Sequence, residues 1–419
     1  MDLRLVHLCI LTLSCSFAQD IDLGTVIFAN VLFRHGDRTP LNPYPTDPYK
    51  NESLWPVPFG QLTNLGRHRH LLLGRWLRNR YEHLLPDTYS LYDIYVRSTD
   101  VDRTLMSAEA NLAGLYPPKD KQIWDNDIKW MPIPIHTIPE KQDNLLAAKK
   151  YCPKYDYEIE KLKNSPEIQR INKENEKLYI YLTEHSGKKI DSLESIEYLY
   201  DTLSIENIFN LTLPKWTTPV FPYKMQKLAS MDFKLPAYNK ILQRLKSGLL
   251  LGEMINHMVK KQEGALYPDR KLWIYSAHDT TVANLLMTLG VFDEHCPPYT
   301  ATVLMELRVN TKEQYFVTIS YKNSSAEPTL LTIPGCLALC PLHQFVKLTK
   351  DTIPEDWEKE CVLDWEQHES SINLTTIFGI LTSSILMLIS LVFMIIGFVY
   401  WHYKREHNQY YRRLTTDPI

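Results

Sequence analysis

A nearly unbroken apolar run close to the C-terminus, Ile377 to Tyr400, constrains this chain more than any other feature. At about 1.5 Å per residue in a helix, a run of this length crosses a lipid bilayer. A removed lipid-anchor signal is the alternative, but such a signal ends in its apolar segment, whereas this chain continues for a charged tail. We therefore predict one transmembrane helix over 377–400 and a tail over 401–419.

Charges on either side of this run predict its orientation. Basic residues follow it and acidic residues precede it, and by the positive-inside rule the basic side faces the cytosol. The chain before the run is then outside the cytosol, as in a type I membrane protein. The flanking charges are Glu366 and Glu369 before the run and Lys404, Arg405, Arg412 and Arg413 after it.

The N-terminus has the form of a secretory signal peptide. Arg4 precedes an apolar segment, and small residues, Ser16 and Ala18, follow at the positions that a signal peptidase reads. We predict that residues 1–18 are cleaved, since the segment is too short to span a bilayer. Export makes four Asn-X-Ser/Thr sequons candidate glycosylation sites: Asn51, Asn210, Asn323 and Asn373.

The remaining chain is long enough to fold around a large core. Of the 419 residues, 44% are hydrophobic, which suggests more than one domain or lobe. The formal net charge of −3 argues against nucleic acid as a partner, because nucleic acid normally selects a basic surface.

A cationic stretch follows the first strand candidate, Thr25 to Leu32, at its C-terminal end. Here His35 lies between Arg34 and Arg38, whose positive charge disfavours the protonated imidazole. A neutral histidine is a nucleophile, and arginine offers forked donors that match phosphate oxygens. The stretch therefore predicts an anion site, with a solvated surface turn as the alternative.

The letters of this stretch, RHGDRTP over 34–40, resemble the RHGxRxP signature of the histidine acid phosphatases. That family also requires a distant His-Asp pair, which this chain has as His278 and Asp279 after the apolar run Leu272 to Tyr275. The resemblance extends from about Thr25 to Leu363, and it is greatest for the branch of prostatic and lysosomal acid phosphatases.

The resemblance implies an α/β fold, with a mostly parallel sheet flanked by helices and a smaller inserted helical lobe. We expect the phosphatase domain over 19–140 and 232–365 and the lobe over 141–231, where we find no candidate chemistry. Leu62 to Tyr81 has helical spacing, with Gly66 and Gly74 as points of close packing.

The same resemblance assigns roles. His35 is the nucleophile that becomes phosphorylated, Asp279 protonates the leaving group, and the phosphate is held by four further side chains, with no metal and no cofactor. These four are Arg34, Arg38, Arg103 and His278. The expected activity is hydrolysis of small phosphate monoesters at acidic pH by a homodimer. The alternatives are a phytase-like inositol-phosphate phosphatase, or a non-catalytic receptor ectodomain, which would require a lost catalytic residue that we do not find.

Cysteines outside the signal peptide are odd in number, so one thiol stays unpaired in an oxidising compartment. Cys336, Cys340 and His343 mimic half of a zinc site, but no second pair completes it, and a local disulfide is favoured. The resemblance implies disulfides Cys336–Cys340 and Cys152–Cys361, with Cys296 alone.

The tail contains Tyr411 followed by Leu414, the form of a tyrosine-based sorting signal that an adaptor binds as an extended peptide. It agrees with an acid-active enzyme delivered through endosomes to the lysosomal membrane, with the catalytic domain in the lumen. A plasma-membrane protein, or one secreted after cleavage, is the alternative.

Overall fold

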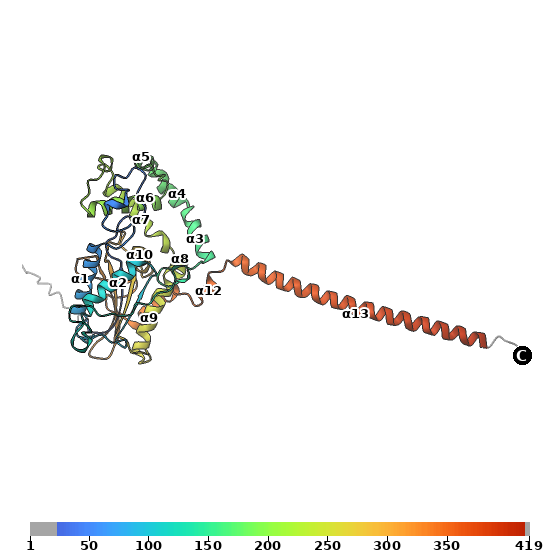
Figure 1. The fold of residues 1–419 in the computed structure, drawn as a ribbon. Coiled ribbons are helices and arrows are strands. Elements are labelled where there is room, and N and C mark those ends of the chain that lie inside the picture. The colour runs from blue at the N-terminus through green and yellow to red at the C-terminus, as the bar shows by residue number, and fades with distance from the viewer. Residues whose placement is uncertain (1–22, 415–419) are drawn as a thin grey trace, which may run out of the picture. The chain divides into compact units, whose positions relative to one another are not determined.

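The computed structural model describes residues 23–414, except the side chains of 364–377 and of 409–414 (Figure 1). The predicted signal peptide, 1–18, lies outside the described residues. The chain divides into two compact units, one up to Trp357 and a second from Glu358 onward.

A single mixed sheet organises the first unit. Its order is β2-β3-β1-β4-β5-β6, and β7 also pairs with β5. β1 and β2 are both parallel to β3, whereas β4 to β7 pair antiparallel. The expected mostly parallel sheet is therefore confined to three strands, because β4 and β5 are joined by a short hairpin loop, which can only connect antiparallel strands. The strands are β1 Thr25–Arg34, β2 Ile94–Ser98, β3 Leu272–Ala277, β4 Thr302–Val309, β5 Tyr315–Lys322, β6 Thr329–Leu331 and β7 Cys340–Pro341.

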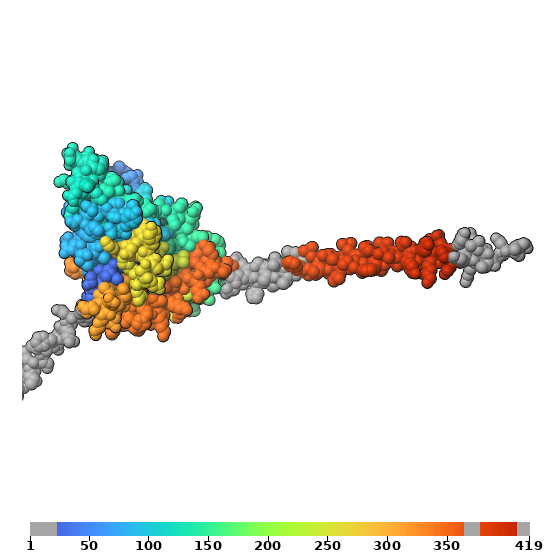
Figure 2. Space-filling view, turned by 90° about the horizontal axis from the view of Figure 1, so that it is seen from below, coloured from blue at the N-terminus to red at the C-terminus, as the bar shows by residue number. Residues whose placement is uncertain are grey.

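β1 lies in the middle of the sheet. Its residues from Phe28 to Arg34 are all buried, and Ile27 is partly exposed. Burial on both faces explains why its sequence is almost continuously apolar. Phe28 and Leu32 pack into one cluster with α9 (Gly248–Gln262), α10 (Asp279–Thr288) and α11 (Leu342–Thr349). Val31 and Phe33 pack into another with α1 (Asn64–Arg80) and α2 (Asp102–Leu115). In Figure 2, α9 (yellow) lies at the surface between blue segments of the first hundred residues and orange segments that follow residue 300.

Helices within residues 153–232 form a lobe with its own core (Figure 1). The cluster includes Ile196 and Leu203 of α6, Leu182 of α5 and Met225 of α7. Ser165 and Ser192 cap two of these helices, and Gly187 ends α5 with φ 71°. The lobe helices are α3 Pro153–Lys163, α4 Pro166–Glu174, α5 Glu176–Ser186, α6 Leu193–Ile208 and α7 Tyr223–Asp232, and α8 Lys240–Lys246 follows them.

The second unit consists of a short stretch and α13, Asp364–Leu414. Within the described chain, one helix is long and apolar enough to cross a membrane, Phe378–Asn408, with a mean hydropathy of 2.5. The predicted span 377–400 coincides with its first part. The backbone of Tyr411 and Leu414 is helical, which differs from the extended peptide expected for a sorting signal, and their side chains lie outside the described residues. Trp357–Glu360 forms the short helix α12.

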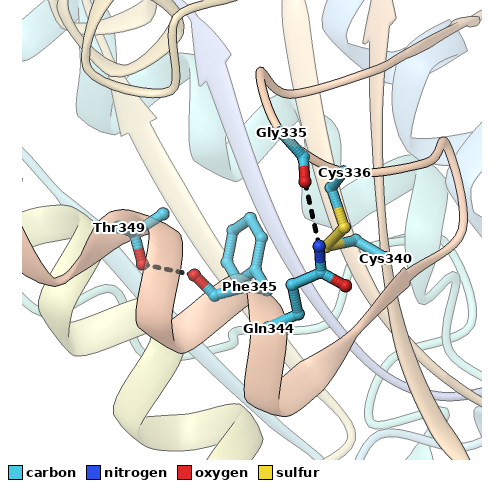
Figure 3. Close-up of a disulfide and its surroundings, with 6 residues drawn as sticks. All are labelled: Gly335, Cys336, Cys340, Gln344, Phe345 and Thr349. Carbon is cyan, nitrogen blue, oxygen red and sulfur yellow. Dashed lines mark hydrogen bonds between the residues drawn. A yellow bond between two sulfur atoms is a disulfide. The ribbon is translucent and has the colours of Figure 1, made fainter.

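A disulfide joins Cys336 and Cys340, with the two Cα atoms 5.6 Å apart (Figure 3). Gln344 Nε2 donates to the carbonyl oxygen of Gly335 at 2.9 Å beside it. Cys152 and Cys361 each take part in a disulfide, and Cys296 is free.

Candidate active site

Three parallel strands bring distant segments to one edge of the sheet. In the register of β1 with β3, Arg34 lies opposite Ala277, and in that of β2 with β3, Ser98 lies opposite Ser276. The amide of His35 donates to the carbonyl of Ala277 at 2.9 Å, and the amide of Thr99 donates to that of Ser276 at 3.1 Å. The residues that follow each strand therefore meet at the carboxyl edge, where open α/β sheets bind ligands.

His35 is buried at this edge in a defined tautomer. Its Nδ1 lies 2.8 Å from the carbonyl oxygen of Gly36, which can only accept, so Nδ1 carries the proton. Its Nε2 accepts from the Nε–H of Arg103 at 3.1 Å. The imidazole is thus neutral, with its lone pair on Nε2. Burial, and then the charges of Arg34 and Arg103, hold the pKa of His35 well below 6.5.

The close approach of backbone around His35 depends on Gly36. A Cβ at this position would lie 2.5 Å from the carbonyl oxygen of Gly66 at the start of α1. The Gly36 amide donates to the Ser107 hydroxyl of α2 at 3.0 Å. α1 and α2 therefore fix the loop that carries the histidine.

Two arginines beside His35 are held by carboxylates. Arg34 Nη2 lies 2.8 Å from Asp279 Oδ2, and Arg38 Nη2 lies 2.9 Å from Asp201 Oδ2. The Nε atoms of Arg34 and Arg38 are buried and have no hydrogen-bond partner within the described part of the chain. Since an unsatisfied buried donor is costly, an anion that accepted from them would be stabilised.

His278 and Arg103 complete the cationic group. His278 Nε2 lies 3.0 Å from the Thr99 hydroxyl, and its ring centre is 5.6 Å from that of His35. Burial and the charge of Arg103 lower the pKa of His278 to about 3. Burial, followed by the charge of Arg38, lowers the pKa of Arg103 to about 10, which indicates a strongly positive and dehydrated pocket.

Asp279 begins α10 directly after His278. Burial alone would raise its pKa, but the charges of Arg34 and Arg38 outweigh burial and hold the pKa of Asp279 below 3.8. The carboxylate is therefore ionised when the pocket is empty.

A cavity of about 280 Å³ opens at this edge, between the sheet and the helical lobe. Arg34, Asp279 and Tyr299 line it from the sheet side, and Glu197 and Asp201 line it from α6. The guanidinium carbon of Arg34 lies 4.1 Å from the centre of the Tyr299 ring. A larger hollow of about 740 Å³ on the lobe, lined by residues of α4, α5 and α7, includes none of the residues around His35.

All six residues assigned to the site from the sequence lie together here, but two contributors were missed. The expectation that the lobe carries no candidate chemistry is wrong for Asp201, whose carboxylate pairs with Arg38. Tyr299 was missed as well. Neither belongs to a recognisable motif, and only the fold brings them to the histidine.

The other sequence-predicted positions lie elsewhere. Asn51, Asn210 and Asn323 are exposed, and the side chain of Asn373 lies outside the described residues. Within residues 23–414, no group of three or more potential metal ligands forms.

A family model, described as the histidine phosphatase superfamily (branch 2), matches residues 25–322. The chain belongs to this superfamily. It is 42% identical over 343 residues to prostatic acid phosphatase of Homo sapiens, covering 80% of this chain and 87% of that protein. It is 38% identical over 380 residues to lysosomal acid phosphatase of Rattus norvegicus, covering 89% of each.

Solved phytase structures share the fold. A Hafnia alvei phytase in complex with myo-inositol hexakis sulphate superposes with a TM-score of 0.63 and 19% identity, covering 81% of this chain and 98% of that chain. A Citrobacter braakii phytase superposes with a TM-score of 0.62 and 17% identity, covering 81% and 100%. Identities this low establish the common fold alone.

Proposed function

We propose that this histidine phosphatase is an acid phosphatase that hydrolyses phosphate monoesters through a phosphohistidine at His35. The observation that carries the proposal is the neutral His35, whose Nε2 lone pair lies among Arg34, Arg38 and Arg103. A deprotonated imidazole nitrogen inside a cluster of cations suits attack on an anionic ester.

In the first step, a substrate phosphate takes the donors of Arg34, Arg38 and Arg103. When Arg103 turns its Nε–H to a phosphate oxygen, the lone pair of His35 Nε2 is released. Nε2 then attacks phosphorus in line, the N–P bond forms and the bond from phosphorus to the alcohol oxygen breaks. The cations, with His278, stabilise charge on the non-bridging oxygens.

Asp279 supplies the proton to the departing alcohol oxygen. The same phosphate that binds Arg34 and Arg38 removes their stabilisation of the carboxylate and adds negative charge nearby, so it raises the pKa of Asp279. At acidic pH a useful fraction then holds a proton. In the second step water attacks phosphorus, its proton passes to Asp279, and the P–N bond breaks to release phosphate.

The charge of the cavity separates this activity from the phytase-like alternative. Its lining includes the carboxylates Glu197, Asp201 and Asp279 against the cations Arg34 and Arg69. An inositol polyphosphate carries several phosphates and needs further cations around the one that reacts. The acids on α6 therefore favour a substrate with a single phosphate. The receptor alternative would need a missing catalytic group, and all six side chains are present.

Phosphate release from the purified lumenal part tests this function. We expect turnover of p-nitrophenyl phosphate and of glycerol 2-phosphate at about pH 5, without added metal and with chelator present. Inositol hexakisphosphate should be a poor substrate at the same concentration. If inositol hexakisphosphate were hydrolysed faster than both simple esters, the phytase-like function would replace this one.

For the whole chain we propose a type I protein of the lysosomal or endosomal membrane. Residues 1–18 are the signal peptide, 377–400 the span and 401–419 the cytoplasmic tail, with the phosphatase domain over 19–140 and 232–365 and the lobe over 141–231. Relatives named lysosomal acid phosphatase and the apolar helix Phe378–Asn408 support this. Asn51, Asn210, Asn323 and Asn373 would be glycosylated, Cys152 would pair with Cys361, and the enzyme would act as a homodimer.

Tyr411 and Leu414 are proposed to bind a sorting adaptor. They lie in the last turn of α13, and terminal turns fray at little cost, so an adaptor can bind this segment extended. Tyr411→Ala should accumulate at the cell surface with unchanged activity, whereas Tyr410→Ala is the matched control. Equal lysosomal fractions for Tyr411→Ala and the wild type would contradict the signal.

A further inference from the structure

Beyond the phosphate-binding end, the cavity has a second side that the alcohol part of a substrate would contact. This side is formed by α6, by the residues after α7 and by the loop before β4. Its lining is apolar at Ile208, Phe233 and Pro298 and acidic at Glu197 and Asp201. We call these five residues the leaving-group wall.

Two of the three carboxylates that line the cavity already have cationic partners. Asp279 pairs with Arg34, and Asp201 pairs with Arg38. The remaining carboxylate, Glu197, makes no ion pair or hydrogen bond with any residue that the structure describes. Arg69, the other cation of the lining, is held by Asp37 at 3.0 Å. The leaving-group wall therefore presents one carboxylate that lacks a partner.

Charges around Glu197 are predominantly negative. Burial, followed by the charges of Asp201, Asp279 and Asp232, raises the pKa of Glu197 well above 4.5, and Arg38 opposes them. Tyr198 and Cys296 are the other titratable groups near it. A phosphate bound to Arg34 and Arg38 would make the surroundings more negative still. A cationic group on the alcohol part of the substrate would be attracted by these carboxylates.

We infer that the leaving-group wall selects phosphate monoesters whose alcohol carries a cationic group on a small apolar body, and that Glu197 binds the cation. The inference rests on the proposed phosphatase function and narrows its substrate class. A cavity of about 280 Å³ accommodates an amino alcohol or a quaternary ammonium alcohol. The aromatic rings of Tyr200, Phe233 and Tyr299 in the lining suit such a cation, because ring faces attract positive charge.

Two esters of the same shape test this inference. Phosphocholine carries a quaternary nitrogen, and 3,3-dimethylbutyl phosphate has an uncharged carbon in the same position. The readout is the ratio of kcat/KM for the cationic ester to that for the neutral ester. At a pH at which Glu197 is ionised, Glu197→Gln should lower this ratio about tenfold, the size of one partly buried ion pair. Its kcat/KM for the neutral ester should fall less than its kcat/KM for the cationic ester. Comparing variants cancels the different intrinsic reactivity of the two alcohols.

Glu194→Gln is the matched control, since Glu194 lies on the same helix but is exposed and does not line the cavity. It should leave the ratio unchanged, and Glu197→Asp should keep part of the preference. Choline alone should inhibit the wild type competitively and Glu197→Gln about tenfold more weakly. This second measurement needs no comparison of substrates.

The pH dependence gives a third readout. The ratio should rise with pH in the wild type as Glu197 ionises, and it should be flat in Glu197→Gln. Turnover of both esters with the same ratio in the wild type and in Glu197→Gln would overturn the inference while leaving the phosphatase function intact. If the wild type hydrolysed neither ester, the phosphatase function itself would fail, and this inference with it.

Discussion

The Nε–H of Arg103 donates to Nε2 of His35 across 3.1 Å, so the nitrogen that would attack phosphorus is occupied while the pocket is empty. The carbonyl of Gly36 holds the other nitrogen protonated. Substrate must therefore draw Arg103 onto a phosphate oxygen before His35 can react. Burial and the charge of Arg38 destabilise the charged guanidinium of Arg103. A bound phosphate would stabilise that charge, so it favours the movement of Arg103 from His35 to the phosphate oxygen.

His35→Ala should abolish catalysis while leaving the arginines in place. We expect kcat for p-nitrophenyl phosphate at about pH 5 to fall at least about 10³-fold. Quenching the wild type with ³²P-labelled substrate should label His35, and the variant should remain unlabelled. His68→Ala, at an exposed position of α1, is the control. Turnover by His35→Ala within about tenfold of the wild type would refute the nucleophile assignment.

Asp279→Asn should distinguish substrates by their leaving group. An alkoxide needs a proton to depart, whereas p-nitrophenolate scarcely does, so the loss should be about 10²-fold or more on glycerol 2-phosphate. On p-nitrophenyl phosphate it should be within about tenfold. Equal losses on both substrates would show that Asp279 serves mainly to hold Arg34.

Asp201 acts through Arg38 and should behave as a positioning residue. In Asp201→Asn the guanidinium loses its charged partner at 2.9 Å, so KM and the inhibition constant of inorganic phosphate should both change by about tenfold. Asp191→Asn, exposed and paired with Lys189, is the control on the lobe. Arg38 Nη1 also donates to the carbonyl oxygen of Thr39 at 3.3 Å. Unchanged phosphate binding in Asp201→Asn would mean that this contact and the surrounding packing are enough to position Arg38.

The sequence predicted the catalytic edge because its residues follow strands. His35 and His278 each come three residues after the end of an apolar run, and parallel strands bring such positions together. That β1 and β3 are neighbours, however, depends on long-range pairing that spacing does not contain, and the family resemblance supplied it. Asp201 had no such signal, because an acid within a charged helix is indistinguishable from a solvated one until the fold sets Arg38 opposite it.

Features that depend on neighbouring residues could be predicted from the sequence, whereas features that depend on distant segments could not. Ser165 and Ser192 cap α4 and α6, and a cap of this kind can be read from the sequence because the interaction is confined to a few neighbouring residues. The mostly parallel sheet was wrong beyond β1, β2 and β3, because strand direction is set by which partner is available across the whole domain. The close packing expected at Gly74 is present, as helical spacing leaves little else for a glycine in mid-helix to do.

Gly74→Ala should destabilise the fold through the contact between α1 and α2. A Cβ at Gly74 would lie 1.9 Å from the carbonyl oxygen of Asn111, which is backbone and cannot rotate away. We expect unfolding free energy to fall by about 3 kcal/mol in chemical denaturation. Gly252→Ala on α9 is the control, because there the Cβ meets a branch methyl of the Ile353 side chain at 2.9 Å and no backbone atom. Similar midpoints for the two variants would show that α1 and α2 separate without cost.

Glu206 should make the protein more stable in acid than at alkaline pH. Burial and the adjacent charge of Asp47 raise the pKa of Glu206 to about 9, far above its ordinary 4.5. The folded protein therefore holds a proton that the unfolded chain releases near pH 4.5, so this contribution is complete below that pH and is lost as pH rises through about 9. Glu206→Gln keeps the size of the side chain and removes the titration. The melting temperature of Glu206→Gln should fall less than that of the wild type between pH 5 and pH 9. Parallel profiles of melting temperature against pH for the two proteins would show that Glu206 and Asp47 do not govern alkaline stability.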